Sequence, residues 1–202
     1  MLQTIKESAE FLQNKTNYNP KVGIILGTGL GGLVDEINIE HSISYEDIPN
    51  FPLSTVEGHT GRLIFGTLGG KQVVAMQGRF HFYEGYCMGK VTFPVRVMKL
   101  LGIECLIVSN ASGGVNPNYE VGDLMILNDH INLIPNPLIG ANIAELGPRF
   151  PDMSEPYCPT LIAKAEVVAK ANNLPVQKGV YVALTGPTLE TPAEYKLSLI
   201  HI

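Results

Sequence analysis

The segment VGIILGTGLGG, residues 22–32, decides the fold class of this chain. Val22–Leu26 is a short apolar run with β-branched side chains, which is typical of a buried strand. The glycine-rich turn GTGLGG of residues 27–32 follows at once and is expected to open a helix. Glycines let the backbone come close to an anion, and exposed N–H groups at such a turn bind phosphate. The segment therefore predicts a strand that ends at an anion site.

Strands and helices alternate along the rest of the chain. Strand-like runs at 62–68 and 72–76 flank Gly69-Gly70, which is a hairpin signal. We expect further strands at 104–109, 124–127 and 180–184, helices at 3–14, 91–101 and 160–171, and loops at 132–158 and, with some extended structure, at 40–60. The alternation predicts an α/β fold, and the hairpin makes the sheet mixed rather than purely parallel.

Composition limits the classes of function. The 202 residues are 45% hydrophobic and 16% charged, which indicates a globular chain. A net charge of −5 argues against broad binding to nucleic acid or to an anionic membrane. Three widely spaced cysteines, no signal-peptide pattern and no membrane-length apolar run predict a cytoplasmic protein with reduced thiols.

The turn at 27–32 also matches the dinucleotide fingerprint G-x-G-x-x-G. That fingerprint requires an acidic residue at the end of a second parallel strand. Glu46 and Asp47 lie in a proline-flanked loop instead, and the next strands form the expected hairpin. A phosphate loop is therefore the favoured interpretation, and a tight turn without a ligand is the structural alternative.

The most informative segment is QGRFHFYEG, residues 77–85. If it is extended, Arg79, His81 and Tyr83 alternate onto one side, with the two phenylalanines on the other. A guanidinium binds phosphate oxygens with two N–H groups, an imidazole donates to an oxyanion, and a phenol reaches a sugar hydroxyl. Glu84 is placed to orient His81 in a charged state. The structural alternative is an exposed loop with a surface ion pair.

Two further segments place polar groups after strands. SNASGG at 109–114 has backbone N–H groups that suit a second anion cradle, although a simple turn explains it when it is taken alone. Glu190, in GPTLET at 186–191, is a carboxylate that can accept from a ring N–H, or an acid at a helix N-terminus. The remaining histidines lack ligand spacing, so no metal is expected.

Together these motifs resemble the trimeric purine nucleoside phosphorylase family. The matching segments, which run in family order to about Lys196, are GTGLGG (27–32), IPNFPLSTVEGHTGRL (48–63), QGRFHFYEGY (77–86), VTFPVRV (91–97), SNASGGVNP (109–117), VGDLMILNDHIN (121–132), RFPDMS (149–154) and GPTLET (186–191).

The resemblance implies a three-layer α/β/α sandwich around a mixed sheet, and a homotrimer. It implies reversible cleavage of 6-oxopurine ribo- and deoxyribonucleosides to the free base and α-ribose 1-phosphate. Inorganic phosphate would be the co-substrate, with no cofactor, no metal, no nucleic-acid partner and no membrane.

The resemblance also assigns residues to roles. His81, Asn110 and Glu190 would be catalytic. The phosphate would be bound by Thr28, His59, Arg79, His81 and Ala111. The nucleoside would be contacted by Tyr83, Phe150, Tyr181, Leu189 and Glu190, with Phe150 reaching the ribose site of a neighbouring subunit.

The sequence departs from the family pattern at two places. Leu189 stands where the family often has a phenylalanine that stacks on the base. The tail at 197–202 differs from the family's continuation, so we expect one phosphorylase domain over 1–196 that is incomplete at its C-terminus. The alternative functions are methylthioadenosine phosphorylase and, in another class, an inactive phosphate- or nucleoside-binding fragment.

Overall fold

The computed structural model describes residues 1–53 and 61–201. The chain divides into two units, Met1–Ala111 and Ser112–Ile202, and each is described by itself. The single domain expected over 1–196 stays a prediction.

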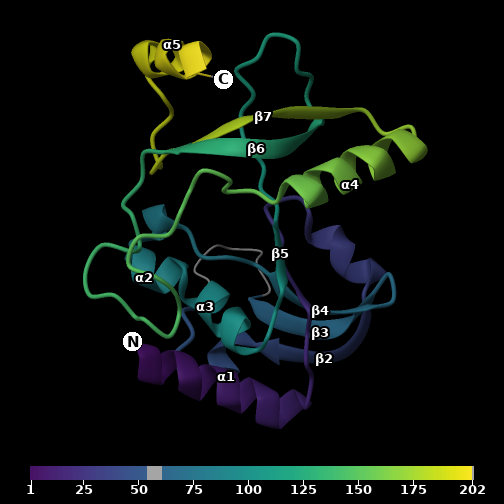
Figure 1. Cartoon of the computed structure of the whole chain (residues 1–202), viewed down its shortest axis with the longest axis vertical. Helices are drawn as coiled ribbons and strands as arrows, with labels where there is room; N and C mark the ends of the chain where they lie inside the picture. Colours follow the sequence, from purple (N-terminus) through teal and green to yellow (C-terminus); the bar gives the residue numbers. More distant parts are fainter. Residues whose placement is uncertain (54–60, 202) are drawn as a thin grey trace. The chain divides into compact units, whose positions relative to one another are not determined.

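A five-stranded mixed sheet forms the centre of the first unit, with the strand order β2-β3-β4-β1-β5. The elements are α1 (Leu2–Thr16), β1 (Val22–Ile25), η1 (Gly31–Glu36), β2 (Asn38–Ser44), η2 (Tyr45–Asp47), β3 (Arg62–Leu68), β4 (Lys71–Gln77), η3 (Phe82–Glu84), α2 (Met88–Val91), α3 (Phe93–Leu100) and β5 (Cys105–Val108) (Figure 1). Strand β1 runs parallel to β4 and β5, whereas β3 runs antiparallel to both its neighbours. The predicted α/β class and mixed sheet are confirmed.

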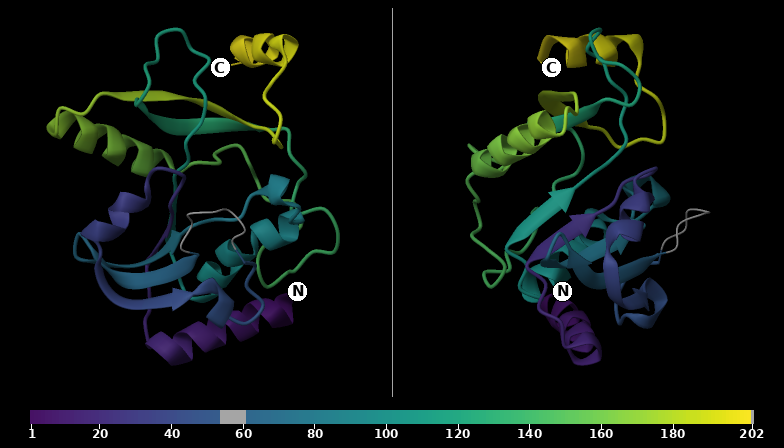
Figure 2. Two further views of the ribbon diagram at one scale, coloured as in Figure 1. Left: turned by 180° about the vertical axis from the view of Figure 1, so that it is seen from behind. Right: turned by 90° about the vertical axis from the view of Figure 1, so that its right-hand side faces the viewer.

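The sheet is covered on both faces. On one face, Ile24 of β1 packs with Ile64 of β3 and Ala75 of β4. Val34 of η1 and Ile37, the residue after η1, cover this cluster. On the other face, a side chain at Gly23 would collide with Met98 and Ile103, so α3 and the turn after it lie directly on β1. Helix α1 packs beside α3 (Figure 2). The carboxyl ends of β1 and β4 therefore emerge from a buried support, whereas the edge strand β5 is largely exposed.

Three local predictions differ from the structure. Residues 40–60 were expected to be loop with some extended structure; Asn38–Ser44 form a regular edge strand, β2, in which Ile43 is the only buried residue, and residues 54–60 lie outside the described part of the chain. The turn at 27–32 leads into a 3₁₀ helix, η1. The helix expected at 91–101 is divided at Thr92 between α2 and α3. The hairpin is confirmed, with positive φ at Gly69 and Gly70 and open space around both.

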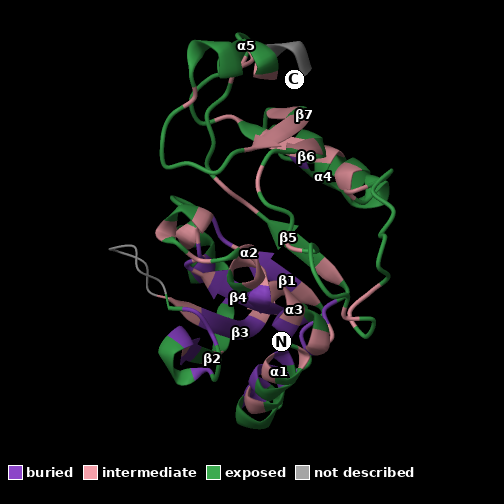
Figure 3. Cartoon of the chain, turned by 90° about the vertical axis from the view of Figure 1, so that its left-hand side faces the viewer, coloured by how far each residue is buried: buried purple, intermediate pink, exposed green. Residues whose placement is uncertain are grey.

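The second unit contains β6 (Leu124–Asn132), α4 (Pro159–Ala171), β7 (Val176–Ala183) and α5 (Pro192–His201). Strands β6 and β7 pair in parallel and extend further than expected. Residues 133–158 form the predicted loop, without helix or strand. Among the described residues of this unit, Ala169 is the one buried residue, and Figure 3 draws the elements of the unit mainly in the exposed and intermediate colours. No helix within residues 1–53 and 61–201 has the length and apolarity needed to cross a bilayer.

Candidate active site

Three connecting segments meet at one edge of the five-stranded sheet. Ile25, the last residue of β1, pairs with Met76 of β4 and Val108 of β5, so the three parallel strands end at the same level. The segments that follow are the turn at 27–32, the loop at 77–86 and the turn at 109–114. The carboxyl ends of parallel strands are where open α/β sheets bind ligands.

Ser109 joins the first and third of these segments. Its hydroxyl accepts from the Gly27 N–H at 3.2 Å and donates to the Ile25 carbonyl at 3.2 Å. Its backbone N–H donates to the same carbonyl at 3.0 Å. A Cβ at Gly27 would lie 2.5 Å from the Ser109 carbonyl oxygen and from Asn110 Cα, so only glycine fits there.

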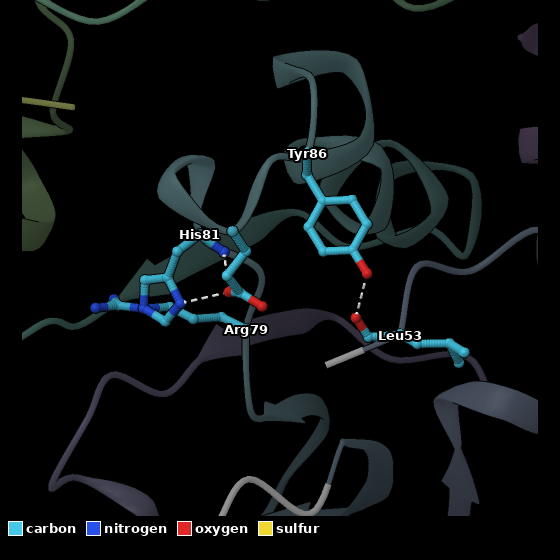
Figure 4. Close-up of polar contacts among 5 residues, drawn as sticks. Leu53, Arg79, His81 and Tyr86 are labelled. Atoms are coloured by element: carbon cyan, nitrogen blue, oxygen red, sulfur yellow. Dashed lines mark hydrogen bonds and ion pairs between the residues drawn. The ribbon is translucent and has the colours of Figure 1, made fainter. Parts of the chain in front are cut away.

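Arg79 and His81 lie next to each other (Figure 4), and Arg79 also contacts Ser109. The Arg79 guanidinium donates from Nη1 to the Ser109 carbonyl at 3.1 Å and from Nε to His81 Nε2 at 3.3 Å. His81 Nδ1 lies 2.8 Å from Glu84 Oε1. Since Nε2 accepts from the guanidinium, this set of bonds fits a neutral imidazole with its proton on Nδ1, rather than the charged ring expected from the sequence.

Glu84 orients His81 through two contacts. Its Oε1 accepts from the His81 backbone N–H at 2.7 Å as well as contacting Nδ1, and its side chain is only 4% exposed. This double contact caps η3, so the loop turns here instead of running extended as predicted. Tyr83 still lies on the same side, because its ring stacks on His81 with centroids 4.9 Å apart.

Aromatic contacts hold the loop at 77–86, and the sequence analysis missed them. The Tyr45 hydroxyl donates to the Gly78 carbonyl at 2.6 Å, and its ring packs against Phe80 at 5.2 Å. The Tyr86 hydroxyl donates to the Leu53 carbonyl at 2.6 Å (Figure 4). Burial raises the pKa of the Tyr45 phenol. Arg79 and His81 thus lie on a loop that is held by the buried Tyr45 at its start and by a bond to the exposed Leu53 at its end.

The remaining predicted phosphate-site residues follow the same strand ends. Thr28 comes directly after Gly27 and is exposed. The Asn110 side-chain amide donates to the Ala111 carbonyl at 3.1 Å, and Ala111 is exposed. His59 lies outside the described residues. The structure therefore brings Gly27, Arg79, His81 and Ser109 into one network, with Thr28 and Asn110 as their chain neighbours.

The predicted nucleoside residues, apart from Tyr83, belong to the second unit. Phe150 and Leu189 are 87% and 85% exposed. Glu190 is partly buried, and its carboxylate raises the pKa of the neighbouring Tyr195 phenol. Tyr181 of β7 is paired with His130 of β6. The contact of Tyr195 with Glu190 was not predicted; the only signal for it was a tyrosine following the GPTLET segment.

A separate hollow of about 420 Å³ lies in the second unit between the loop at 154–159, β6 and α4, and it includes Asp129, Glu166 and Lys178. The Lys178 ammonium and the Glu166 carboxylate form a 2.8 Å ion pair there. None of the predicted site residues lines this hollow. In the part of the chain that the structure describes, no group of three or more histidine, cysteine or acidic side chains is arranged to hold a metal ion.

Comparison with known proteins gives consistent matches over nearly the whole chain. The model of the family described as "Phosphorylase superfamily" matches residues 21–201. Purine nucleoside phosphorylase 1 of Bacillus subtilis is 59% identical over 197 residues, which cover 97% of this chain and 73% of that protein. Purine nucleoside phosphorylase of Bos taurus is 50% identical over 198 residues, covering 95% of this chain and 68% of that protein.

Solved structures agree with these sequence matches. Isoform 2 of purine nucleoside phosphorylase from Schistosoma mansoni, in complex with cytosine and ribose-1-phosphate, superposes with a TM-score of 0.92 at 42% identity over 98% of this chain and 72% of that one. A schistosoma purine nucleoside phosphorylase in complex with hypoxanthine superposes with a TM-score of 0.91 at 48% identity, with the same coverage.

Proposed function

The chain belongs to the purine nucleoside phosphorylase family of the phosphorylase superfamily, and on that premise we propose that it cleaves purine nucleosides with inorganic phosphate. The reaction is reversible and gives a free purine base and α-ribose 1-phosphate. Ribo- and deoxyribonucleosides of 6-oxopurines, such as inosine, are the proposed substrates. Phosphate acts as the co-substrate, and the proposal needs no other cofactor.

One observation carries this proposal: the convergence of three turns on Arg79 and Ser109 at the end of parallel strands. Arg79 donates to Ser109 and to His81, so two segments hold the guanidinium in place. An oxyanion that accepted from Arg79 would take the place of His81 Nε2 as the acceptor of the Arg79 Nε–H, and His81 donates to the same oxyanion only when Nε2 carries a proton. Guanidinium groups bind phosphate oxygens in pairs, and preorganised donors are worth most in such sites.

The reaction requires positioning rather than a protein nucleophile. Cleavage of the C1′–N9 bond leaves positive charge on the ribose, and a phosphate anion held beside C1′ stabilises that charge and then forms the new bond. We assign phosphate binding to Thr28, His59, Arg79, His81 and the backbone of Ala111. Holding phosphate and nucleoside in line turns a bimolecular reaction into a unimolecular step within one complex. This positioning can lower the activation free energy by about 7–11 kcal/mol.

The departing purine gains negative charge and becomes the neutral base when a proton from solvent reaches its ring. We assign Glu190 to anchor the base by accepting from a purine ring N–H, and Asn110 to line the site. Tyr83 contacts the ribose, and Tyr181 and Leu189 lie near the base.

The proposal includes a homotrimer in which Phe150 covers the ribose site of a neighbouring subunit. The 87% exposure of Phe150 supports a role at an interface. Light scattering during size-exclusion chromatography tests this point, and a monomer at micromolar concentration would contradict it. A cytoplasmic location is also proposed, since Cys87, Cys105 and Cys158 carry free thiols, the state kept in a reducing compartment.

The activity is tested by following inosine in ultraviolet absorbance with and without phosphate. We expect hypoxanthine to form only when phosphate is present, and ribose 1-phosphate to form in equal amount. Methylthioadenosine serves as the comparison substrate and should react much more slowly. Release of base without phosphate, or faster cleavage of methylthioadenosine than of inosine, would contradict the proposal.

A further inference from the structure

We infer that Ser109 is a positioning residue of the phosphate site, acting through both its hydroxyl and its carbonyl. The inference rests on the proposed function, because it concerns how the same anion is held. Ser109 is the first residue after β5. None of the roles assigned above belongs to it.

The hydroxyl of Ser109 fixes the turn after β1. It accepts from the Gly27 N–H and donates to the Ile25 carbonyl, both at 3.2 Å, so both of its hydrogen-bonding functions are used. These partners lie 82 and 84 residues away in sequence. An alanine at position 109 would leave the Gly27 N–H without this acceptor, whereas a threonine would keep the hydroxyl.

The carbonyl of Ser109 fixes the direction of Arg79. Its oxygen accepts from Arg79 Nη1 at 3.1 Å, while Arg79 Nε donates to His81 at 3.3 Å. A guanidinium is a rigid planar fork, so two fixed N–H directions determine where its other donors point. Ser109 therefore sets the orientation of the guanidinium as well as the position of the glycine turn.

The two functions of Ser109 are mechanically coupled by close packing. The Gly27 Cα approaches the peptide between Ser109 and Asn110 so closely that an added Cβ would lie 2.5 Å from the Ser109 oxygen. Any shift of residue 109 must therefore move Gly27 and the neighbouring Thr28. Misplacement of positioning groups by about 1 Å can reduce rates about a hundredfold, so this coupling bears directly on phosphate capture.

The experiment compares Ser109→Ala, Ser109→Thr and the matched control Ser8→Ala with the unmodified chain. Ser8 is a buried serine that, like the partly buried Ser109, loses hydrogen bonds on truncation, because its hydroxyl donates to the Thr4 and Pro49 carbonyls. The measurements are the dissociation constant of inorganic phosphate by calorimetry, thermal stability, and the KM values of phosphate and inosine.

We expect Ser109→Ala to weaken phosphate binding about tenfold, as the loss of an acceptor for a buried N–H suggests. The KM of inosine should stay within about twofold, as should phosphate binding by Ser8→Ala. Ser109→Thr should recover most of the phosphate affinity. If the role of Ser109 is purely structural, Ser109→Ala should behave like Ser8→Ala: thermal stability should fall and phosphate affinity should stay unchanged.

Three outcomes separate this inference from the proposed function. If the unmodified chain binds phosphate and cleaves inosine but Ser109→Ala binds phosphate equally well, only the inference is wrong. If the unmodified chain binds phosphate without cleaving inosine, the proposed function is wrong and the affinity ratio of the variants still decides the role of Ser109. If it neither binds phosphate nor cleaves inosine, both are wrong.

Discussion

The sheet of residues 1–111 and the sheet of residues 112–202 differ in how much apolar surface they bury. In β3 of the first unit, Leu63, Ile64 and Phe65 are all 0% exposed. In the second unit, Leu124 of β6 is 54% exposed, and every described residue of β7 stays at least partly exposed. Figure 3 shows the contrast as buried colour gathered on the first sheet.

The proposed roles follow the same division except for Tyr83 and Asn110, which serve the nucleoside from the first unit. The assigned phosphate ligands belong to the first unit, whereas Phe150, Tyr181, Leu189 and Glu190 belong to the second. Binding of an anion depends on donors that are fixed before it arrives, and a buried sheet supplies that rigidity. Contacts to a purine and a ribose rely on apolar surface, and exposed side chains such as Leu189 provide it. These side chains lose conformational entropy when they become ordered on binding.

The largest expected effect tests the difference in packing directly. Phe65→Ala should lower the free energy of unfolding by about 3–5 kcal/mol, because it removes a fully buried ring that also packs on Tyr18. Val168→Ala, at a 57% exposed position of α4, should change it by at most about 0.5 kcal/mol. Urea denaturation measures both, and equal losses would remove the contrast between the units.

The next effect concerns the chemistry of the first unit. Arg79→Ala should slow phosphorolysis about 10²–10³-fold, since it removes a preorganised donor to the anion. Steady-state kinetics with inosine and saturating phosphate measures the loss. Lys71→Ala, which removes a positive charge at the exposed start of β4, is the control and should keep a near-normal rate. A similar rate for both variants would refute the role of Arg79.

Two side-chain contacts of a carboxylate, equal in length, sharpen the comparison further. His81 with Glu84, and Lys178 with Glu166, are both 2.8 Å apart, but the first pair is 16% and 4% exposed and the second 47% and 43%. Glu84→Ala should cost about 1.5–3 kcal/mol of stability. Glu166→Ala should cost about 0–1 kcal/mol. Chemical denaturation of both variants provides the test, and a larger loss for Glu166→Ala would reverse the expected order.

The smallest effect is a dependence on alkaline pH. Burial raises the pKa of Tyr45, so the folded state keeps its phenolic proton at pH values where the unfolded chain has lost it. The unfolded state then binds fewer protons, and stability must fall as pH rises above about 10. Tyr45→Phe should cost about 1 kcal/mol at neutral pH through the lost bond to Gly78.

Between pH 10 and pH 11, the Tyr45→Phe variant should lose less stability than the unmodified chain. Thermal unfolding followed by circular dichroism at several pH values measures the difference. Parallel curves for the two proteins would mean that Tyr45 is not the group responsible.

Local apolar patterns made much of the first unit predictable. The runs at 22–26, 62–68 and 72–76 are buried strands, and the Gly69-Gly70 turn between the last two gives their register. Strand β2 was missed because its sequence NIEHSIS buries only Ile43 and owes its existence to pairing with β3. The outer parts of β6 and β7 were missed for a related reason, since polar residues such as Asn128 and Lys178 interrupt the apolar pattern.

The site was predictable as a set of segments but not as a geometry. Arg79 and His81 were identified from residue type and from their place after a strand. The turn that brings them together depends on the two contacts of Glu84 with His81. These contacts were not predicted, because the segment was assumed to be extended. The contacts of Tyr45 with Gly78 and of Ser109 with Gly27 join residues 33 and 82 positions apart, so no local pattern could reveal them.

The hairpin tip at Gly69-Gly70 offers a practical attachment point. Nothing lies within 4 Å of a side chain placed at either glycine. The seven residues of β4 separate this tip from the Arg79 loop by roughly 20 Å. A short flexible insert here could carry a fluorophore or tether the protein to a sensor surface, so that phosphate capture could be followed on immobilised molecules while the opposite end of the strand stays unmodified.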